Sequence, residues 1–212
     1  RYLKNRAERR FTVIQAVVLA ERLRERGHDV LFATRGRRGE ARADRMDGLP
    51  VVRPPFFSVH PFHIFVHGLF LRAALRRLPS PPDVVHFHSP LVPPLRLPWP
   101  AVTTFHSLSW SDFAGPARGV RYRLRKLMAR TLSYRLERRL LSRTDEIILV
   151  NANARRTLEE KYGCSREVHV LPNVVDVETF RPASLPPGKP VILYVGRLGF
   201  GQPPGRGRHR AA

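Results

Sequence analysis

Apolar positions along the chain follow two alternating patterns. Helical spacing predicts helices over residues 11–26, 61–78, 118–143 and 154–162. Short apolar runs between them predict strands near residues 28–34, 51–53, 83–89, 101–106, 147–150, 167–171 and 190–195. Strands that alternate with helices at these intervals are typical of an α/β fold with a parallel sheet and right-handed crossovers. We therefore predict a parallel sheet flanked by helices.

Segments without this periodicity predict loops. Residues 35–49 are rich in Arg, Gly and Asp, which indicates a solvated loop, and residues 107–116 also read as a loop. Five prolines between residues 89 and 100 predict a stiff connection, because proline fixes φ and has no N–H to donate. Residues 201–212 are rich in Gly, Pro and Arg, and we expect this tail to be disordered.

Two neighbouring strands of the predicted sheet end in histidine and serine. His86, His88 and Ser89 close the first strand, and His106 and Ser107 close the second. Ligands of open α/β sheets bind in the crevice outside the carboxyl ends of the strands. Period-two spacing places His86 and His88 on one face of their strand. The sequence therefore predicts three imidazoles at one edge of the sheet, where a ligand would bind.

A metal site is an alternative interpretation of these histidines. No nearby carboxylate or cysteine completes a site around His86 and His88, and Asp83 falls on the opposite face of the strand. His63 and His67 lie four residues apart on a predicted helix, which is also a metal-like spacing, although such pairs more often face solvent. We expect no metal at either pair.

The chain is strongly basic, with 38 Lys and Arg against 17 Asp and Glu and a formal net charge of +21. Such a charge favours anionic partners: nucleic acid, an anionic membrane surface or a phosphorylated substrate. No motif for groove or single-strand recognition is present, so we do not expect specific nucleic-acid binding. The alternative function that the charge allows is a non-catalytic module that binds anionic membrane or nucleic acid.

The predicted helix from Arg118 to Arg143 concentrates this charge, with ten Lys or Arg and one acidic residue, Glu137. Two interpretations of the helix remain open: a core-packing helix with a solvated outer face, and a helix that docks on anionic lipid. Its apolar positions recur at helical spacing and are Val120, Leu124, Leu127, Met128, Leu132, Leu136 and Leu140.

Cys164 is the only cysteine, which excludes an intramolecular disulfide and favours a reducing compartment. The longest apolar-leaning segment, residues 62–78, is interrupted by charges and is too short to span a bilayer. The first ten residues are mostly charged and show no signal-peptide pattern. We expect a cytoplasmic location, with peripheral contact at the inner face of the membrane.

The order of motifs resembles the retaining glycosyltransferases of family 4 (glycosyl transferases group 1), whose GT-B fold has two Rossmann-like domains. The matching stretches run over residues 12–198 and are Arg22 to Val30, Asp83 to Pro90, Thr104 to Ser107, Thr144 to Asn151, Leu171 to Asp176 with Phe180 to Pro182, and Leu193 to Leu198. The resemblance implies transfer of a hexose such as mannose or glucose from a nucleotide diphosphate sugar to a lipid or glycan acceptor, without a metal cofactor.

The same resemblance implies roles for individual residues. His106 would face the donor sugar as the catalytic residue, and His86, His88, Ser89 and Ser107 would contact substrate. Gly196 and Arg197 would bind the donor diphosphate, for which a guanidinium has matching bidentate geometry. Asn173 and Asp176 suit a structural turn at the domain junction.

The resemblance also implies a domain organisation. Residues 1–182 would form the acceptor-side Rossmann-like domain, with its first strand missing or atypical. Residues 183–200 would form the linker and first strand of a truncated donor-binding domain. The chain departs from the family pattern at Val174, where glycine is usual, and has no lysine shortly after Arg197. We thus expect one wall of an active site, whose opposite wall belongs to a donor domain.

Overall fold

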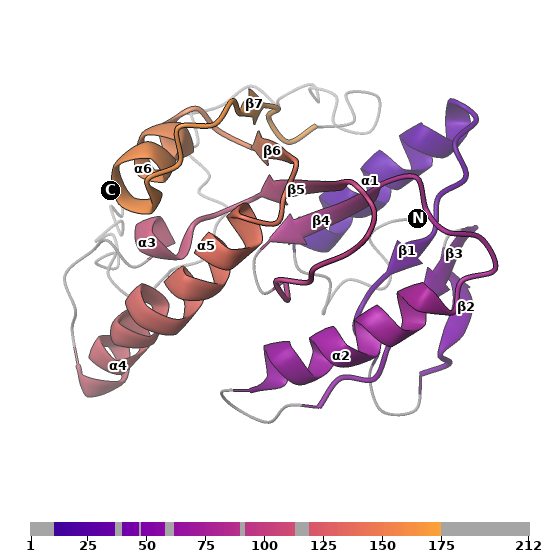
Figure 1. Ribbon diagram of the computed structural model, residues 1–212, viewed down its shortest axis with the longest axis horizontal. Helices are drawn as coiled ribbons and strands as arrows, with labels where there is room; N and C mark the ends of the chain where they lie inside the picture. The colour runs from indigo at the N-terminus through magenta and orange to yellow at the C-terminus, as the bar shows by residue number, and fades with distance from the viewer. Residues whose placement is uncertain are drawn as a thin grey trace, which may run out of the picture.

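The computed structural model describes residues 11–36, 40–46, 48–57, 62–89, 92–112 and 119–174. These residues confirm the α/β class and the parallel sheet. The larger sheet has four parallel strands in the order β4-β5-β6-β7, which are β4 (Val85–Ser89), β5 (Ala101–Phe105), β6 (Glu146–Leu149) and β7 (His169–Val170) (Figure 1). The strand predicted at 190–195 lies outside the described residues, as do residues 1–10, where the family's first strand was expected to be missing or atypical.

A smaller sheet has the order β1-β3-β2, formed by β1 (Phe32–Ala33), β3 (Leu49–Val52) and β2 (Ala43–Met46). The prediction of a loop over residues 35–49 is wrong at β2, which pairs antiparallel with β3. Three of the four β2 residues are exposed, so this edge strand has no apolar pattern to reveal it. The predicted strand at 28–34 is also shorter, because only β1 pairs with β3.

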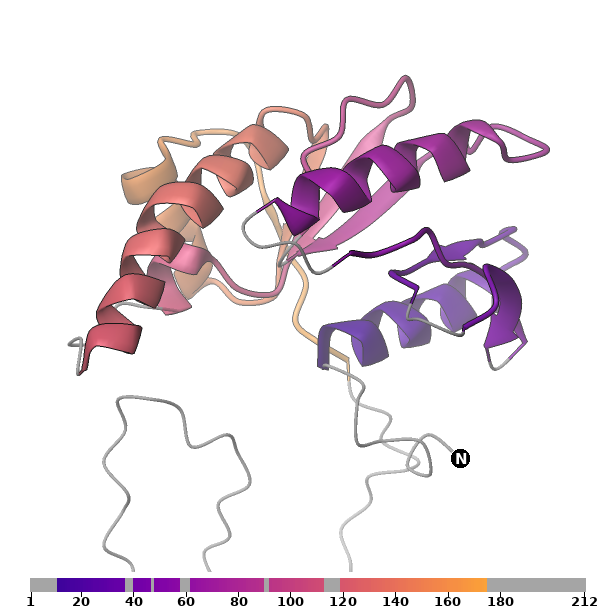
Figure 2. The same cartoon turned by 90° about the horizontal axis from the view of Figure 1, so that it is seen from below.

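Helices cover both faces of the larger sheet. They are α1 (Phe11–Glu25), α2 (His63–Arg76), α4 (Val120–Met128), α5 (Tyr134–Leu141) and α6 (Asn153–Tyr162). In Figures 1 and 2, α2 and the rod formed by α4 and α5 lie on one side of β4 and β5, and α1 lies on the other. Gly27 and Gly163 follow α1 and α6 with φ of 88° and 63°, as expected for glycine at a helix C-terminus.

The main core lies between the larger sheet and the helices α5 and α6. Burial of a large apolar side chain contributes about 1.5–3 kcal/mol. The most deeply buried residues of this cluster are Phe105, Leu108, Ile147, Leu149 and Leu158. The β5 and β6 strands therefore form the rigid centre from which the ends of the neighbouring strands are positioned.

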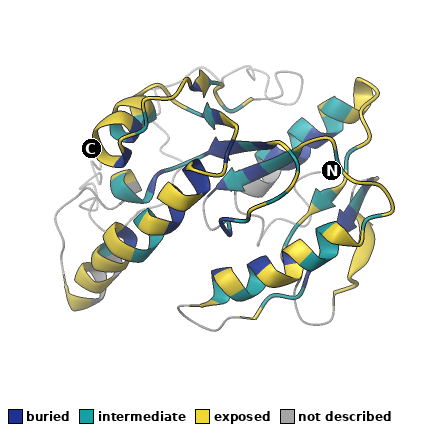
Figure 3. Ribbon diagram, viewed as in Figure 1, coloured by how far each residue is buried: buried dark blue, intermediate teal, exposed yellow. Residues whose placement is uncertain are grey.

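The predicted helix over residues 118–143 is one continuous rod, but it contains a π turn (Ala129–Ser133) between α4 and α5. A π turn makes i→i+5 hydrogen bonds and accommodates an extra residue. On the α5 side Leu136 and Leu140 are buried in the core, whereas on the α4 side Val120, Leu124 and Leu127 are exposed. Figure 3 shows this exposed end of the rod. The core-packing interpretation of the apolar stripe is thus correct for α5 and wrong for α4.

A buried carboxylate, Glu137 on α5, holds a short helix that the sequence predicts as loop. Glu137 is 7% exposed and accepts hydrogen bonds from the backbone N–H of Ser109 at 3.1 Å, from the Ser109 hydroxyl at 2.7 Å and from the Tyr162 hydroxyl. Ser109 begins α3 (Ser109–Asp112). The carboxylate therefore connects α3, α5 and α6 just beyond the end of β5.

Candidate active site

The register of β4 and β5 brings the predicted histidines together. His88 is the Cα partner of Thr104, and His86 is the Cα partner of Val102. Because side chains alternate between faces along a strand, the imidazoles of His86 and His88 share a face with Thr104. His106 follows β5 directly and its ring joins the same face. The predicted cluster of three imidazoles at the carboxyl edge is confirmed.

Hydrogen bonds and ring stacking fix the three imidazoles in a row. Nε2 of His86 lies 2.8 Å from the Thr104 hydroxyl, and Nδ1 of His88 lies 3.1 Å from Nε2 of His106. The ring centroids of His86 and His88 are 4.4 Å apart, and those of His88 and His106 are 5.4 Å apart, with both pairs stacked. The row presents His106 as its terminal ring beyond the end of β5.

Burial keeps these rings neutral near pH 7. It lowers the pKa of His86 to about 4 and that of His88 to about 3, and the neighbouring imidazoles add to the effect. Burial also lowers the pKa of His106, while a hydrogen bond with the Asn173 side chain acts in the opposite direction. A neutral imidazole donates through one nitrogen and accepts through the other. The row can therefore hold hydroxyl groups, which need both a donor and an acceptor.

The lowered pKa values predict a loss of stability in acid. Between pH 6.5 and 4.5 the unfolded chain takes up protons on His86 and His88 while the folded chain does not, so the free energy of unfolding should fall by about 4 kcal/mol. Urea titrations at pH 7.0, 6.0 and 5.0 would measure this loss. The double variant His86→Phe and His88→Phe should flatten the profile, and the exposed His28→Gln should not. An unchanged slope in the double variant would contradict the prediction.

Asn173 belongs to this cluster, although the sequence indicated only a structural turn there. Its side chain lies near enough to His106 to offset part of the fall in the pKa of that ring. The segment that carries it follows β7 and is connected to α1, because the Gln15 side chain donates to the Val174 carbonyl at 3.3 Å. Asn173 could have been found from its position in the sheet. It follows β7, which is parallel to β5 and lies two strands from it, and ligands of such sheets bind outside the carboxyl ends of the strands.

The other predicted site residues lie elsewhere or outside the described residues. Ser89 is buried at 1% exposure and lines a cavity of about 30 Å³ with Ser109, Ser133 and Glu137, on the helix α5 side of the sheet. It is therefore not on the face of β4 that carries His86 and His88. Ser107 follows His106 in the turn after β5. Gly196, Arg197 and Asp176 lie outside the described residues.

In the described part of the chain, no group of three or more His, Cys, Asp and Glu side chains lies together as a metal ion would require. The row at the strand ends is stacked ring on ring, a geometry in which the nitrogen lone pairs do not meet at a point. His67 uses Nδ1 to donate to the Pro55 carbonyl at 3.2 Å, and the Phe56 ring lies edge-on to His63 and His67.

Comparison with known families finds a match to glycosyltransferase family 4. The model of glycosyltransferase family 4 matches residues 13–179, which is well over half of the chain and includes the three histidines. No curated protein sequence matches the chain.

Solved structures include a similar fold, that of sucrose-phosphate synthase from Thermosynechococcus elongatus. The TM-score is 0.62 at 13% sequence identity, over 81% of this chain and 44% of that protein. The chain thus spans less than half the length of the synthase, and at this identity the likeness concerns the fold alone. The described residues form a Rossmann-like half of the GT-B architecture, as the sequence predicts.

Proposed function

The chain belongs to glycosyltransferase family 4, and on that basis we propose that it supplies the acceptor side of a retaining hexosyltransferase. The donor is a nucleotide diphosphate sugar carrying a hexose such as mannose or glucose, and the acceptor is a hydroxyl group of a lipid or glycan. The reaction needs no metal in this proposal.

The row of neutral imidazoles is the observation that carries this proposal. Sugar substrates present dense hydroxyl groups, and each ring has one nitrogen that the hydrogen bonds of the row do not use, which donates or accepts according to its tautomer. His106, at the end of the row, contacts the donor sugar, while His86 and His88 on β4 lie on the acceptor side. Asn173 lies beside His106. Arg197 provides fixed positive charge for the departing diphosphate.

Sugar transfer would be tested with a full-length protein in which this chain is followed by a complete donor-binding domain. Purified protein would be incubated with UDP-, GDP- and ADP-hexoses and with lipid and oligosaccharide acceptors, and products would be identified by mass spectrometry and by NMR of the anomeric configuration. We expect one donor to be used and its configuration to be retained. Absence of transfer from every donor, together with tight retention of nucleic acid at physiological salt, would favour the non-catalytic basic module instead.

We further propose a cytoplasmic location for this activity, with the protein on the inner face of the membrane. Within the part of the chain that the structure describes, no helix is long and apolar enough to cross a bilayer. A lipid acceptor would then reach the enzyme only if the protein meets the membrane surface.

A further inference from the structure

Helix α2 carries apolar side chains on the stripe that faces away from the sheet. Phe62, at the start of α2, is 59% exposed and Leu69 is 70% exposed, with Phe65 between them at 39%. Positions i, i+3 and i+7 share one side of a helix. Arg72 and Arg76 continue the same stripe and are exposed. The outward side of α2 therefore begins apolar and ends basic.

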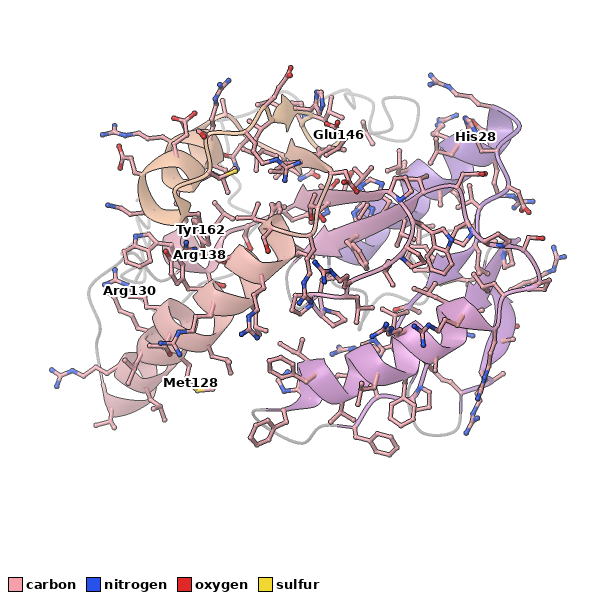
Figure 4. The ribbon with its side chains drawn as sticks, viewed as in Figure 1. His28, Met128, Arg130, Arg138, Glu146 and Tyr162 are labelled. Carbon is pink, nitrogen blue, oxygen red and sulfur yellow. The ribbon has the colours of Figure 1, made fainter. Side chains whose placement is uncertain are left out.

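Helix α4 has the same character. Val120, Leu124 and Leu127 recur at i, i+4 and i+7 and are 81%, 57% and 59% exposed. Exposed arginines flank them at Arg123 and Arg130. Figure 4 shows Met128 and Arg130 on different sides of the rod, with Arg130 on the side of α6, where its guanidinium lies 4.7 Å from the Trp110 ring.

A groove of about 610 Å³ lies between α2 and the part of the rod formed by the π turn and α5. Phe65 of α2 forms one wall, Leu132 and Leu136 contribute apolar surface from the rod, and Arg135 and Arg139 are among its charged lining residues. The groove therefore borders the α2 stripe directly, and the α4 stripe precedes the groove residues on the same rod. We take the two stripes together as the α2–α4 surface: Phe62, Phe65, Leu69, Val120, Leu124, Leu127 and Met128 with the arginines around them.

The charge of this surface has a single sign. Between residues 62–76 and 119–143 the acidic side chain is Glu137, which is buried and hydrogen-bonded to Ser109 and Tyr162. A second copy of the chain would bring the same arginines face to face, so repulsion opposes self-association there. Nucleic acid would meet the arginines but leave the phenylalanines and leucines without a partner. An anionic bilayer offers phosphate to the former and acyl chains to the latter.

We propose that the α2–α4 surface docks on an anionic phospholipid bilayer. The apolar stripes of α2 and α4 enter the interface between headgroups and acyl chains, while the flanking arginines contact lipid phosphates. Docking rests on, and makes specific, the membrane location proposed above; it is measured without sugar transfer, so its failure would remove that location and leave the proposed transfer reaction untouched. Docking in this form differs from attraction of the whole chain by its net charge, because docking requires the apolar side chains of the α2–α4 surface.

Vesicle flotation of the purified chain would test docking. We expect binding to vesicles of phosphatidylcholine with 30 mol% phosphatidylglycerol and at least tenfold weaker binding to pure phosphatidylcholine. Replacing Val120, Leu124 and Leu127 with serine should weaken binding to the anionic vesicles by at least tenfold, and the pair Phe65→Ser and Leu69→Ser should act in the same direction. Arg123→Gln and Arg135→Gln should each weaken it about fivefold at 0.1 M salt.

Matched controls use side chains of similar exposure elsewhere. The triple variant Leu31→Ser, Val84→Ser and Leu171→Ser removes apolar side chains that are 39%, 52% and 56% exposed outside the surface and should bind normally. Arg26→Gln and Arg45→Gln make the same change in net charge. Equal losses in test and control variants would overturn the proposal. So would a dimer, detected by light scattering, that disappears with the α4 serine variant.

Discussion

Replacement of His106 with alanine is expected to lower kcat by roughly 100- to 1,000-fold in a full-length protein that carries both halves of the GT-B fold. His106 is the terminal imidazole of the row, and its Nε2 is oriented by Nδ1 of His88 at 3.1 Å. In the proposed reaction, the variant removes the imidazole that would face the donor sugar. Steady-state transfer assays at saturating donor would measure the change.

Companion variants separate a role in catalysis from a role in folding. His106→Gln retains a polar side chain and should restore part of the activity, while the exposed His28→Ala should behave as the unmodified protein. The midpoint of thermal unfolding should change little in all three, because His106 is half-buried rather than part of the core. Near-normal turnover of His106→Ala would remove this residue from the mechanism.

Replacement of Glu137 with alanine is expected to lower the free energy of unfolding by about 3–5 kcal/mol. The substitution leaves the Ser109 N–H, the Ser109 hydroxyl and the Tyr162 hydroxyl without their acceptor in a buried place. The carboxylate also raises the pKa of Tyr162, after desolvation by burial, which is the larger cause. Urea denaturation at pH 7.5 would measure the loss.

Graded variants test whether the hydrogen bonds cause this effect. Glu137→Gln keeps one acceptor oxygen and should cost about 1–2 kcal/mol, and Tyr162→Phe should cost a similar amount. Glu159→Ala is a matched control, since Glu159 forms an exposed i,i+4 ion pair with Arg155 and should cost less than about 0.5 kcal/mol. Similar losses for Glu137→Ala and Glu159→Ala would contradict the prediction.

The sequence predicted those parts of the fold in which burial imposes a pattern. Strands β4, β5 and β6 carry buried apolar residues of the main core, so their apolar runs are readable, and glycines mark the ends of α1 and α6. Strand β2 was not predicted because its residues are mostly exposed. Its pairing with β3 uses backbone N–H and C=O groups, which every sequence has, so it leaves no mark in the sequence. Helix α3 was not predicted because the group that stabilises its first residue, Ser109, is the carboxylate of Glu137, which lies 28 residues away in the sequence.

The site was predictable where strand register determines it. His86, His88 and His106 follow from two parallel strands ending side by side. The opposite orientation of Ser89 follows from the same alternation, since it is one residue from His88. The contact of Asn173 with His106 depends on a distant segment folding back across the sheet edge, and no local periodicity encodes such a contact.

The π turn at Ala129–Ser133 contains one residue more than a regular α-helical turn would hold. Loss of a single residue there, such as Thr131, would convert the π turn into a regular α-helical turn, so α4 would keep nearly its present direction and its stripe the same outward side. Loss of a residue within α4 itself would have a different effect, because each residue turns an α-helix by about 100°. The π turn is therefore the place in the rod where a change of one residue in length disturbs the two flanking helices least.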